Sequence, residues 1–104
     1  MSKHTVAVNM IGTATVGDAP DLANIEAEQA VIAAVLMRND LAEELDLSEE
    51  HFAEPIHRVI WRATAETIAA GHRATPVTLK PALEALPDVA QGLTVPAYMI
   101  RLVA

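Results

Sequence analysis

The sequence predicts an all-α fold, a compact orthogonal bundle of about five to six helices preceded by a flexible N-terminal arm. Two observations support this prediction. Hydrophobic residues make up 52% of the 104 positions, only three residues are aromatic, and most of the apolar side chains are Ala, Leu, Val and Ile. Beyond residue 20 the apolar positions recur at helical spacing, without an alternating strand pattern of useful length. A chain of this length suits one domain, which buries about two thirds of its unfolded surface.

The composition excludes several classes of site and protein. Cysteine is absent, which rules out disulfides, thiolate metal sites and cysteine nucleophiles and suits a reducing cytosol. Fourteen acidic residues against seven basic ones give a formal net charge of −7, which repels nucleic-acid phosphates and disfavours strong direct binding to DNA or RNA. No apolar run approaches the roughly 20 residues of a membrane span, and the N-terminus does not resemble a signal peptide. We expect a cytoplasmic protein.

Residues 1–20 are rich in Thr, Val, Gly and Ala without a helical period, and we interpret them as the flexible arm. The arm contains GTATVGDA at 12–19, which has the two-glycine frame of a phosphate-binding loop. Asp18 and Ala19 replace the lysine and the hydroxyl residue that hold phosphate and magnesium in such a loop. We therefore expect no nucleotide or other cofactor to bind this chain.

The first predicted helix runs from Asn24, a good N-cap, to about Arg38. Glu26 and Glu28 lie in its first turn, where the helix dipole favours negative charge, and we interpret both as charges that stabilise the helix terminus and aid solubility. Its middle, Ala30–Met37, is eight consecutive apolar residues. A helix that is apolar on nearly every side needs cover on nearly every side.

A short helix, Leu41–Leu47, should follow, and Ser48 should cap one further turn that carries Phe52. A long helix is predicted to begin at Pro55 and to end just before Gly71. Its predicted core face comprises Ile56, Val59, Ile60, Ala63 and Thr67, and its opposite face comprises His57, Arg58, Arg62 and Glu66.

Two more helices complete the predicted bundle. One spans Leu79–Leu86, with Thr78 as N-cap, Pro81 in the first turn and Pro87 as the stop signal. The last opens with Pro96 in its first turn and reaches Ala104 without a capping residue. The predicted core consists of Val31, Ile32, Val35, Leu36, Phe52, Ile56, Val59, Ile60, Leu79 and Leu83.

No catalytic or metal-binding constellation is evident. The two serines lie in the arm and at a predicted helix start, and the spacing of His51 and His57 matches no helical metal pair. Trp61 lies at the edge of the apolar stripe, where it favours the core over a contact role, and the ring of Tyr98 should pack with its hydroxyl reaching water or a partner. The candidate protein-contact surface comprises Arg58, Trp61, Arg62, Ala65 and Tyr98.

Four motifs follow one another in residues 24–104: NIEAEQAVIAAVLM at 24–37, LSEEHFAEPIHRVIWRAT at 47–64, Gly71 with PVTL at 76–79, and PAYMIRLVA at 96–104. Together and in this order they resemble the N-terminal domain of bacterial replicative DNA helicases of the DnaB type. Two positions depart from the family pattern, which often has Gly in place of Ala33 and usually has Asp in place of His51. Residues 21–104 would form the helical head domain of that family.

This resemblance implies a head that sits on a RecA-like ATPase motor, forms a collar over a hexameric ring and contacts primase. The head itself would be non-catalytic, and ATP and magnesium would bind the motor domain of the parent helicase. The expected partners are other copies of the head, as a dimer or higher oligomer, together with primase and a helicase loader. The family carries a helical hairpin after the head, so we expect the chain to be truncated at Ala104 before the hairpin and the motor.

Three alternatives remain open. A free-standing adaptor of phage origin could keep the head fold and bind a helicase or primase, and a stop codon near Ala104 would favour it. An enzyme could be built from the carboxylates and histidines, although no constellation suggests one. DNA binding through Arg58, Arg62, Arg73 and Lys80 would give an affinity that falls steeply with salt.

Overall fold

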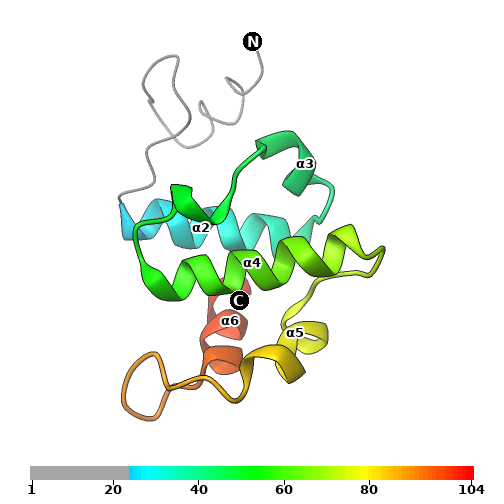
Figure 1. Ribbon diagram of the computed structural model, residues 1–104. Coiled ribbons are helices and arrows are strands. Elements are labelled where there is room, and N and C mark those ends of the chain that lie inside the picture. Colours follow the sequence, from blue (N-terminus) through cyan, green and yellow to red (C-terminus); the bar gives the residue numbers. More distant parts are fainter. Residues whose placement is uncertain (1–23) are drawn as a thin grey trace.

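A computed structural model describes residues 24–104, which fold entirely as helices, turns and loops (Figure 1). The elements are α2 (Ile25–Met37), α3 (Leu41–Leu45), the 3₁₀ turn η1 (Glu49–His51), α4 (Pro55–Ala69), α5 (Pro76–Leu83) and α6 (Val95–Val103). Within this range no strand forms, and an isolated bridge joins Ala90 to Leu93. The all-α prediction is confirmed. The predicted arm, residues 1–20, lies outside the described residues.

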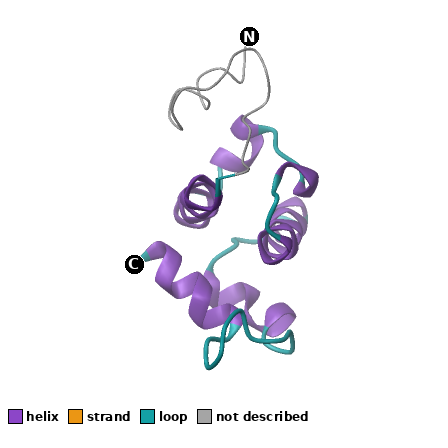
Figure 2. Cartoon of the chain, turned by 90° about the vertical axis from the view of Figure 1, so that its left-hand side faces the viewer, coloured by secondary structure: helices purple, strands orange, loops and turns teal. Residues whose placement is uncertain are grey.

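The helices form two layers. Helices α2 and α4 run side by side in Figure 1, and both are seen end-on after the quarter turn of Figure 2. Helices α5 and α6 form the other layer, in which α6 lies across α2 and also contacts α5. None of the helices in residues 24–104 is long and apolar enough to cross a membrane.

The long apolar run of α2 is covered by three elements of this chain. Helix α4 packs along one side, α6 crosses another, and α3 lies over a third. This cover buries Val31, Ile32, Val35 and Leu36 and leaves Met37, at the end of the helix, 61% exposed. The beginning is also as predicted, because the Asn24 carboxamide oxygen accepts the N–H groups of Glu26 and Ala27 at 2.7 and 3.1 Å.

Helix α4 begins and ends as the sequence predicts. Pro55 occupies its first position, where the missing N–H breaks no helical bond. Gly71 follows the C-terminal end with φ +88°, a left-handed conformation that glycine adopts without strain. The N–H of His72 reaches back to the carbonyl of Thr67, and that of Gly71 to Ile68, which forms a Schellman cap.

Both boundaries of α5 differ from the prediction, which was Leu79–Leu86. Helix α5 begins at Pro76 and ends at Leu83, with Thr75 rather than Thr78 as N-cap. The reason is a reciprocal capping box, in which each threonine accepts the backbone N–H of the other, at 2.9 and 3.1 Å. Pro81 therefore lies inside the helix rather than in its first turn.

The predicted Leu41–Leu47 helix ends two residues early, at Leu45. Asp46 takes a left-handed conformation with φ 49° and ψ 46°, which terminates α3. Aspartate tolerates this conformation better than most residues because its short polar side chain can bond locally. Ser48 is the N-cap residue of η1 as expected, and its N–H donates to Nδ1 of His51 at 3.0 Å.

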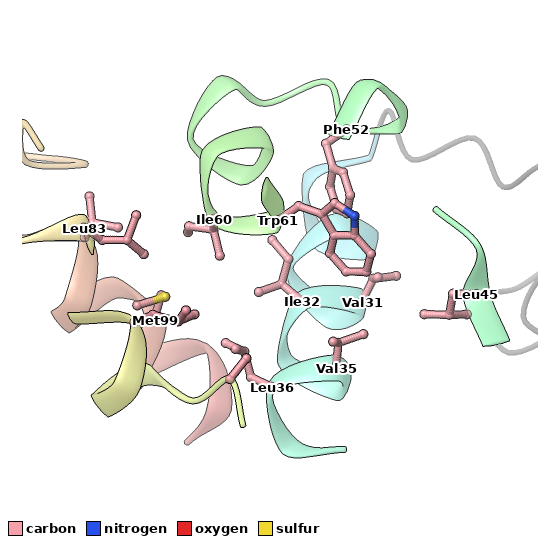
Figure 3. Packing of buried hydrophobic residues seen from close by; sticks show 13 residues of the cluster. Val31, Ile32, Val35, Leu36, Leu45, Phe52, Ile60, Trp61, Leu83 and Met99 are labelled. Carbon is pink, nitrogen blue, oxygen red and sulfur yellow. The ribbon is translucent and has the colours of Figure 1, made fainter. Parts of the chain in front are cut away.

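The core lies between α2, α4 and the α5–α6 layer (Figure 3). Phe52 and Trp61 pack on the α2 side with ring centroids 5.2 Å apart, while Leu83 and Met99 lie in the α5–α6 layer. Eight of the ten residues expected in the core are buried: Val31, Ile32, Val35, Leu36, Phe52, Ile60, Leu79 and Leu83. The remaining two, Ile56 and Val59, are half-buried and pack against this cluster.

Candidate protein-contact site

A hydrogen-bonded series of polar side chains crosses the interior and connects three helices. Glu28 of α2 places Oε1 2.7 Å from Nδ1 of His57 on α4, and Nε2 of His57 lies 2.7 Å from the hydroxyl of Tyr98 on α6. Nε2 of Gln29 donates to the same hydroxyl at 3.0 Å. Glu28 and His57 have no exposed surface. We call these four residues the polar cluster.

The Glu28 carboxylate also caps the beginning of α4. It accepts the backbone N–H of Ala53 at 2.6 Å and that of Glu54 at 3.2 Å. Glu54 is the N-cap residue, but its own side chain makes no capping bond. A negative charge at this position meets the positive end of the α4 dipole and satisfies backbone donors that have no intrahelical partner.

The hydrogen-bond geometry of the polar cluster indicates which atoms of His57 and Tyr98 carry the protons. Because a carboxylate can only accept, Nδ1 of His57 carries the proton that faces Glu28. With a neutral imidazole, Nε2 then accepts from the Tyr98 hydroxyl, whose oxygen accepts in turn from Gln29. Every donor therefore meets an acceptor, which is the condition under which a buried polar group can stabilise a fold.

The order carboxylate, imidazole, hydroxyl is shared with hydrolase triads. Here the hydroxyl is a phenol that already bonds both His57 and Gln29. Neither of the two surface grooves described below is lined by Glu28, His57 or Tyr98. The arrangement acts as a brace that fixes the positions of α2, α4 and α6.

Two predictions about this region are wrong. His57 was expected on the exposed face of the long helix, and Glu28 was expected as a surface charge, whereas both are completely buried. The sequence of α2 did indicate that Glu28 is buried. Glu28 precedes Val31, Ile32 and Val35 by three, four and seven residues, so it lies on the same face of the helix. His57 adjoins the half-buried Ile56 and lies three residues before Ile60, at the edge of the apolar stripe.

The expected contact residues divide into two groups. Trp61 is only 3% exposed, and its indole N–H donates to the carbonyl of Leu47 at 3.2 Å, so its side chain is not free to meet a partner. Tyr98 is half-buried and bonded within the polar cluster. Arg58, Arg62 and Ala65 recur along one side of α4, where both arginines are exposed and the alanine is half-buried.

Both arginines are anchored to the segment before α4. Nε of Arg58 donates to the carbonyl of Phe52 at 2.6 Å. Arg62 grips the carboxylate of Glu49 with two nitrogens, Nη2 at 2.7 Å from Oε1 and Nε at 3.0 Å from Oε2. The hydrogen bond from Arg62 is the main reason that the pKa of Glu49 lies below its usual value, and the same bond raises the pKa of Arg62. The exposed face of α4 is thus held in a defined shape.

Residues of the described range, 24–104, line two grooves that open on the surface. One, about 510 Å³ in volume, lies between α2 and α3, and the other, about 390 Å³, lies between the beginning of α4 and the loop after α5. The first is lined by Asn24, Glu26, Ala27, Ala30, Val31, Ala34, Leu41 and Leu45. The second is lined by Glu54, Pro55, Ile56, Val59, Leu86, Pro87, Asp88 and Val89. In both grooves the described lining residues are mostly apolar.

Across residues 24–104, no three His, Asp or Glu side chains gather in an arrangement that could hold a metal ion. The fold and its surface define a small all-helical domain with a buried polar brace and apolar surface grooves.

The particular family follows from comparison with known proteins. A family model described as the DnaB-like helicase N-terminal domain matches residues 21–104. The chain belongs to this family, which confirms the resemblance found in its four motifs.

Named relatives agree with the family. Replicative DNA helicase DnaB of Rickettsia typhi is 37% identical over 83 residues, which cover 76% of this chain and 17% of that protein. Replicative DNA helicase DnaB of Rickettsia conorii is 41% identical over 59 residues, which cover 55% of this chain and 12% of that protein. The chain thus spans less than a fifth of the length of these relatives. No solved structure gave a significant match.

Proposed function

We propose that this chain is the non-catalytic head domain of a replicative DNA helicase, and that it mediates ring assembly and contact with primase during DNA replication. The observation that carries the proposal is the family match over residues 21–104, together with relatives that are named replicative DNA helicases. In this proposal the motor domain of the parent protein binds ATP and magnesium and moves the DNA. The head works in the cytoplasm through contacts with other proteins, which include a helicase loader.

The surface supports a role in protein contact. Ile25, Met37, Val77 and Ile100 are large apolar side chains that are at least half exposed, and they are spread over α2, α5 and α6. A ring subunit needs apolar surface on more than one side, because each copy meets different neighbours through different patches. Two apolar grooves add further contact area.

The polar cluster supports the same role. Its titratable groups are engaged with each other and with the backbone at the beginning of α4, so they hold the head rigid rather than meet a substrate. A rigid head presents its contact surface in one conformation, which lowers the entropy lost on binding. The surplus of acidic residues likewise favours protein partners over nucleic acid.

Sedimentation velocity over a wide range of protein concentration tests ring assembly. We expect the sedimentation coefficient of the purified chain to rise with concentration, because heads of neighbouring subunits would associate. A single monomeric species at the highest concentration would contradict the assembly part of the proposal. The same samples, assayed for nucleotide hydrolysis, should show no turnover, and hydrolysis by the purified chain would contradict the non-catalytic part.

Addition of the primase from the same genome tests the second contact. We expect a faster-sedimenting complex that contains both proteins. Arg62→Glu on the exposed side of α4 should weaken this complex if that face meets primase, and Lys80→Glu on α5 is a matched control in which a basic residue is also reversed. Equal recovery of primase by all three proteins would reject the α4 face as the contact surface.

A further inference from the structure

The groove between α2 and α3 has a floor of small side chains and a wall of leucines. Ala27, Ala30 and Ala34 lie at spacings of three and four on α2, and Leu41 and Leu45 of α3 stand beside them. Ala30 is exposed, so the floor of the groove is open to the surface. Small residues allow the axis of another helix to come close, because interaxial distance depends on the side chains at the contact.

The polar groups in this groove do not form a binding site for a small molecule. Asn24 already uses its carboxamide oxygen to cap α2. Among residues 24–104, Glu26 is the only charged residue in the lining. Small-molecule sites usually combine an apolar pocket with several convergent polar groups that fix orientation, and the described residues supply no such set to this groove. Its volume of about 510 Å³ suits a row of apolar side chains from another protein.

The surroundings of the groove are negatively charged. The segment 41–51, which includes α3, carries five acidic residues and no Lys or Arg: Glu43, Glu44, Asp46, Glu49 and Glu50. Glu49 is neutralised by Arg62, and Asp40 at the beginning of α3 by Arg38. Among residues 24–104, no Lys or Arg forms a salt bridge with Glu26, Glu43 or Glu44. Arg38 also lies close enough to Glu44 to interact with it electrostatically, but the acidic groups around α3 still outnumber this one basic group, so the α3 side of the groove is negatively charged.

From this geometry we propose that the α2–α3 groove docks an amphipathic helix of a partner protein. The apolar side of that helix rests on Ala27, Ala30 and Ala34, and a flank rich in Lys or Arg faces the acids of α3. Helix-in-groove recognition of this type takes its affinity from the apolar anchors, whereas charge complementarity sets the orientation and the rate of association. The inference deepens the proposed function, on which it rests, by assigning one recruiting surface of the head.

Two synthetic peptides of about 18 residues test the proposal, since helices of this length form appreciably in water. Both carry the same Leu and Ala face, and one has Lys flanks whereas the other has Glu flanks. Each is titrated into the full chain, labelled for amide NMR, at low and high salt. We expect the basic peptide to shift the resonances of Ala30, Ala34 and Leu45 and to bind at least about tenfold more tightly than the acidic one. High salt should reduce this difference.

Two sets of variants locate the site. Ala30→Arg fills the floor and adds repulsive charge, and it should weaken the basic peptide about tenfold or more, whereas Ala82→Arg, at an exposed alanine of α5, should leave binding unchanged. If Ala30→Arg does not fold, the double change Glu43→Lys with Glu44→Lys replaces it, because both positions are exposed. That variant should reverse the preference and favour the acidic peptide, and Glu84→Lys is its control.

Several results would overturn the proposal. These are equal affinity for the two peptides, shifts that map away from the groove, and unchanged binding by Ala30→Arg or by the charge-reversal variant. Concentration-dependent shifts of the groove resonances without peptide would assign the groove to a second copy, and contacts with residues 1–23 in the free chain would assign it to this chain itself. Failure of the chain to bind primase while the basic peptide binds the groove would contradict the proposed function and leave the groove assignment standing.

Discussion

The buried carboxylate of Glu28 should be the most sensitive polar group in the fold, and Glu28→Gln tests this with a nearly isosteric change. Oε1 accepts from His57 Nδ1 and from the N–H of Glu54, and Oε2 accepts from the N–H of Ala53. Glutamine retains only one acceptor oxygen. If the glutamine oxygen takes the place of Oε1, the new NH₂ group faces the N–H of Ala53, which lies 2.6 Å from Oε2 in the unchanged protein. In the other orientation the NH₂ group faces two donors, Nδ1 of His57 and the N–H of Glu54.

The expected loss follows from these contacts. One buried donor without an acceptor costs about 1–3 kcal/mol, and hydrogen bonds to a charged group exceed those to a neutral group by about 1 kcal/mol each. With two such bonds retained but weakened, the free energy of unfolding should fall by about 3–5 kcal/mol. A loss of about 3 kcal/mol lowers the Tm of a domain of this size by roughly 12–24 °C.

Urea denaturation followed by far-UV circular dichroism measures this loss directly. Glu26→Gln is the matched control, because Glu26 lies two residues earlier on the same helix and is exposed. The control should change the unfolding free energy by no more than about 0.5 kcal/mol. If Glu28→Gln is as stable as the control, the carboxylate does not support α4 and the brace interpretation is refuted.

Three further predictions concern individual contacts. Asn39→Ala removes three hydrogen bonds, to the end of α2 and to the backbone just before α5, and should lower the unfolding free energy by about 2–3 kcal/mol in urea denaturation; a change below about 0.5 kcal/mol would contradict the contact. Trp61→Phe keeps a buried ring but removes the bond to Leu47, and in the same assay it should lower stability by about 1–3 kcal/mol. Arg62→Ala should raise the lowered pKa of Glu49 toward its usual value in an NMR titration, because the hydrogen bond from Arg62 is the largest cause of the lowering. The Arg62–Glu49 contribution to stability is present above that usual pKa and is lost as pH falls through the lowered pKa.

Local signals in the sequence were sufficient for much of the fold. The Asn24 cap, Pro55 at the first position of α4 and Gly71 after its end each act within a few residues, so the boundaries they mark agree with the structure. The N-cap of α5 was predicted wrongly as Thr78, whereas Thr75, three residues earlier and directly before Pro76, caps the helix. The reciprocal bonds between the two threonines decide the boundary, and only the folded backbone shows them.

The polar cluster was missed because its contacts join residues that are distant in sequence. His57 lies 29 positions after Glu28 and 41 before Tyr98. A pattern within one helix can place a residue on a face, but it cannot say that two polar residues from different helices will satisfy each other. The hydrogen bond of Trp61 could not be predicted for the same reason, because its indole N–H donates to the carbonyl of Leu47, which lies between α3 and η1.

The central claim is that the head acts through its surface while the polar cluster keeps its interior rigid. Hydrogen–deuterium exchange of the chain with and without primase tests this claim most directly. We predict slower exchange at exposed helix faces or along the grooves when primase is present, and unchanged slow exchange at the Ala53 and Glu54 amides that bond Glu28. Identical exchange with and without primase, or changes centred on the amides around Glu28 and His57, would contradict the account.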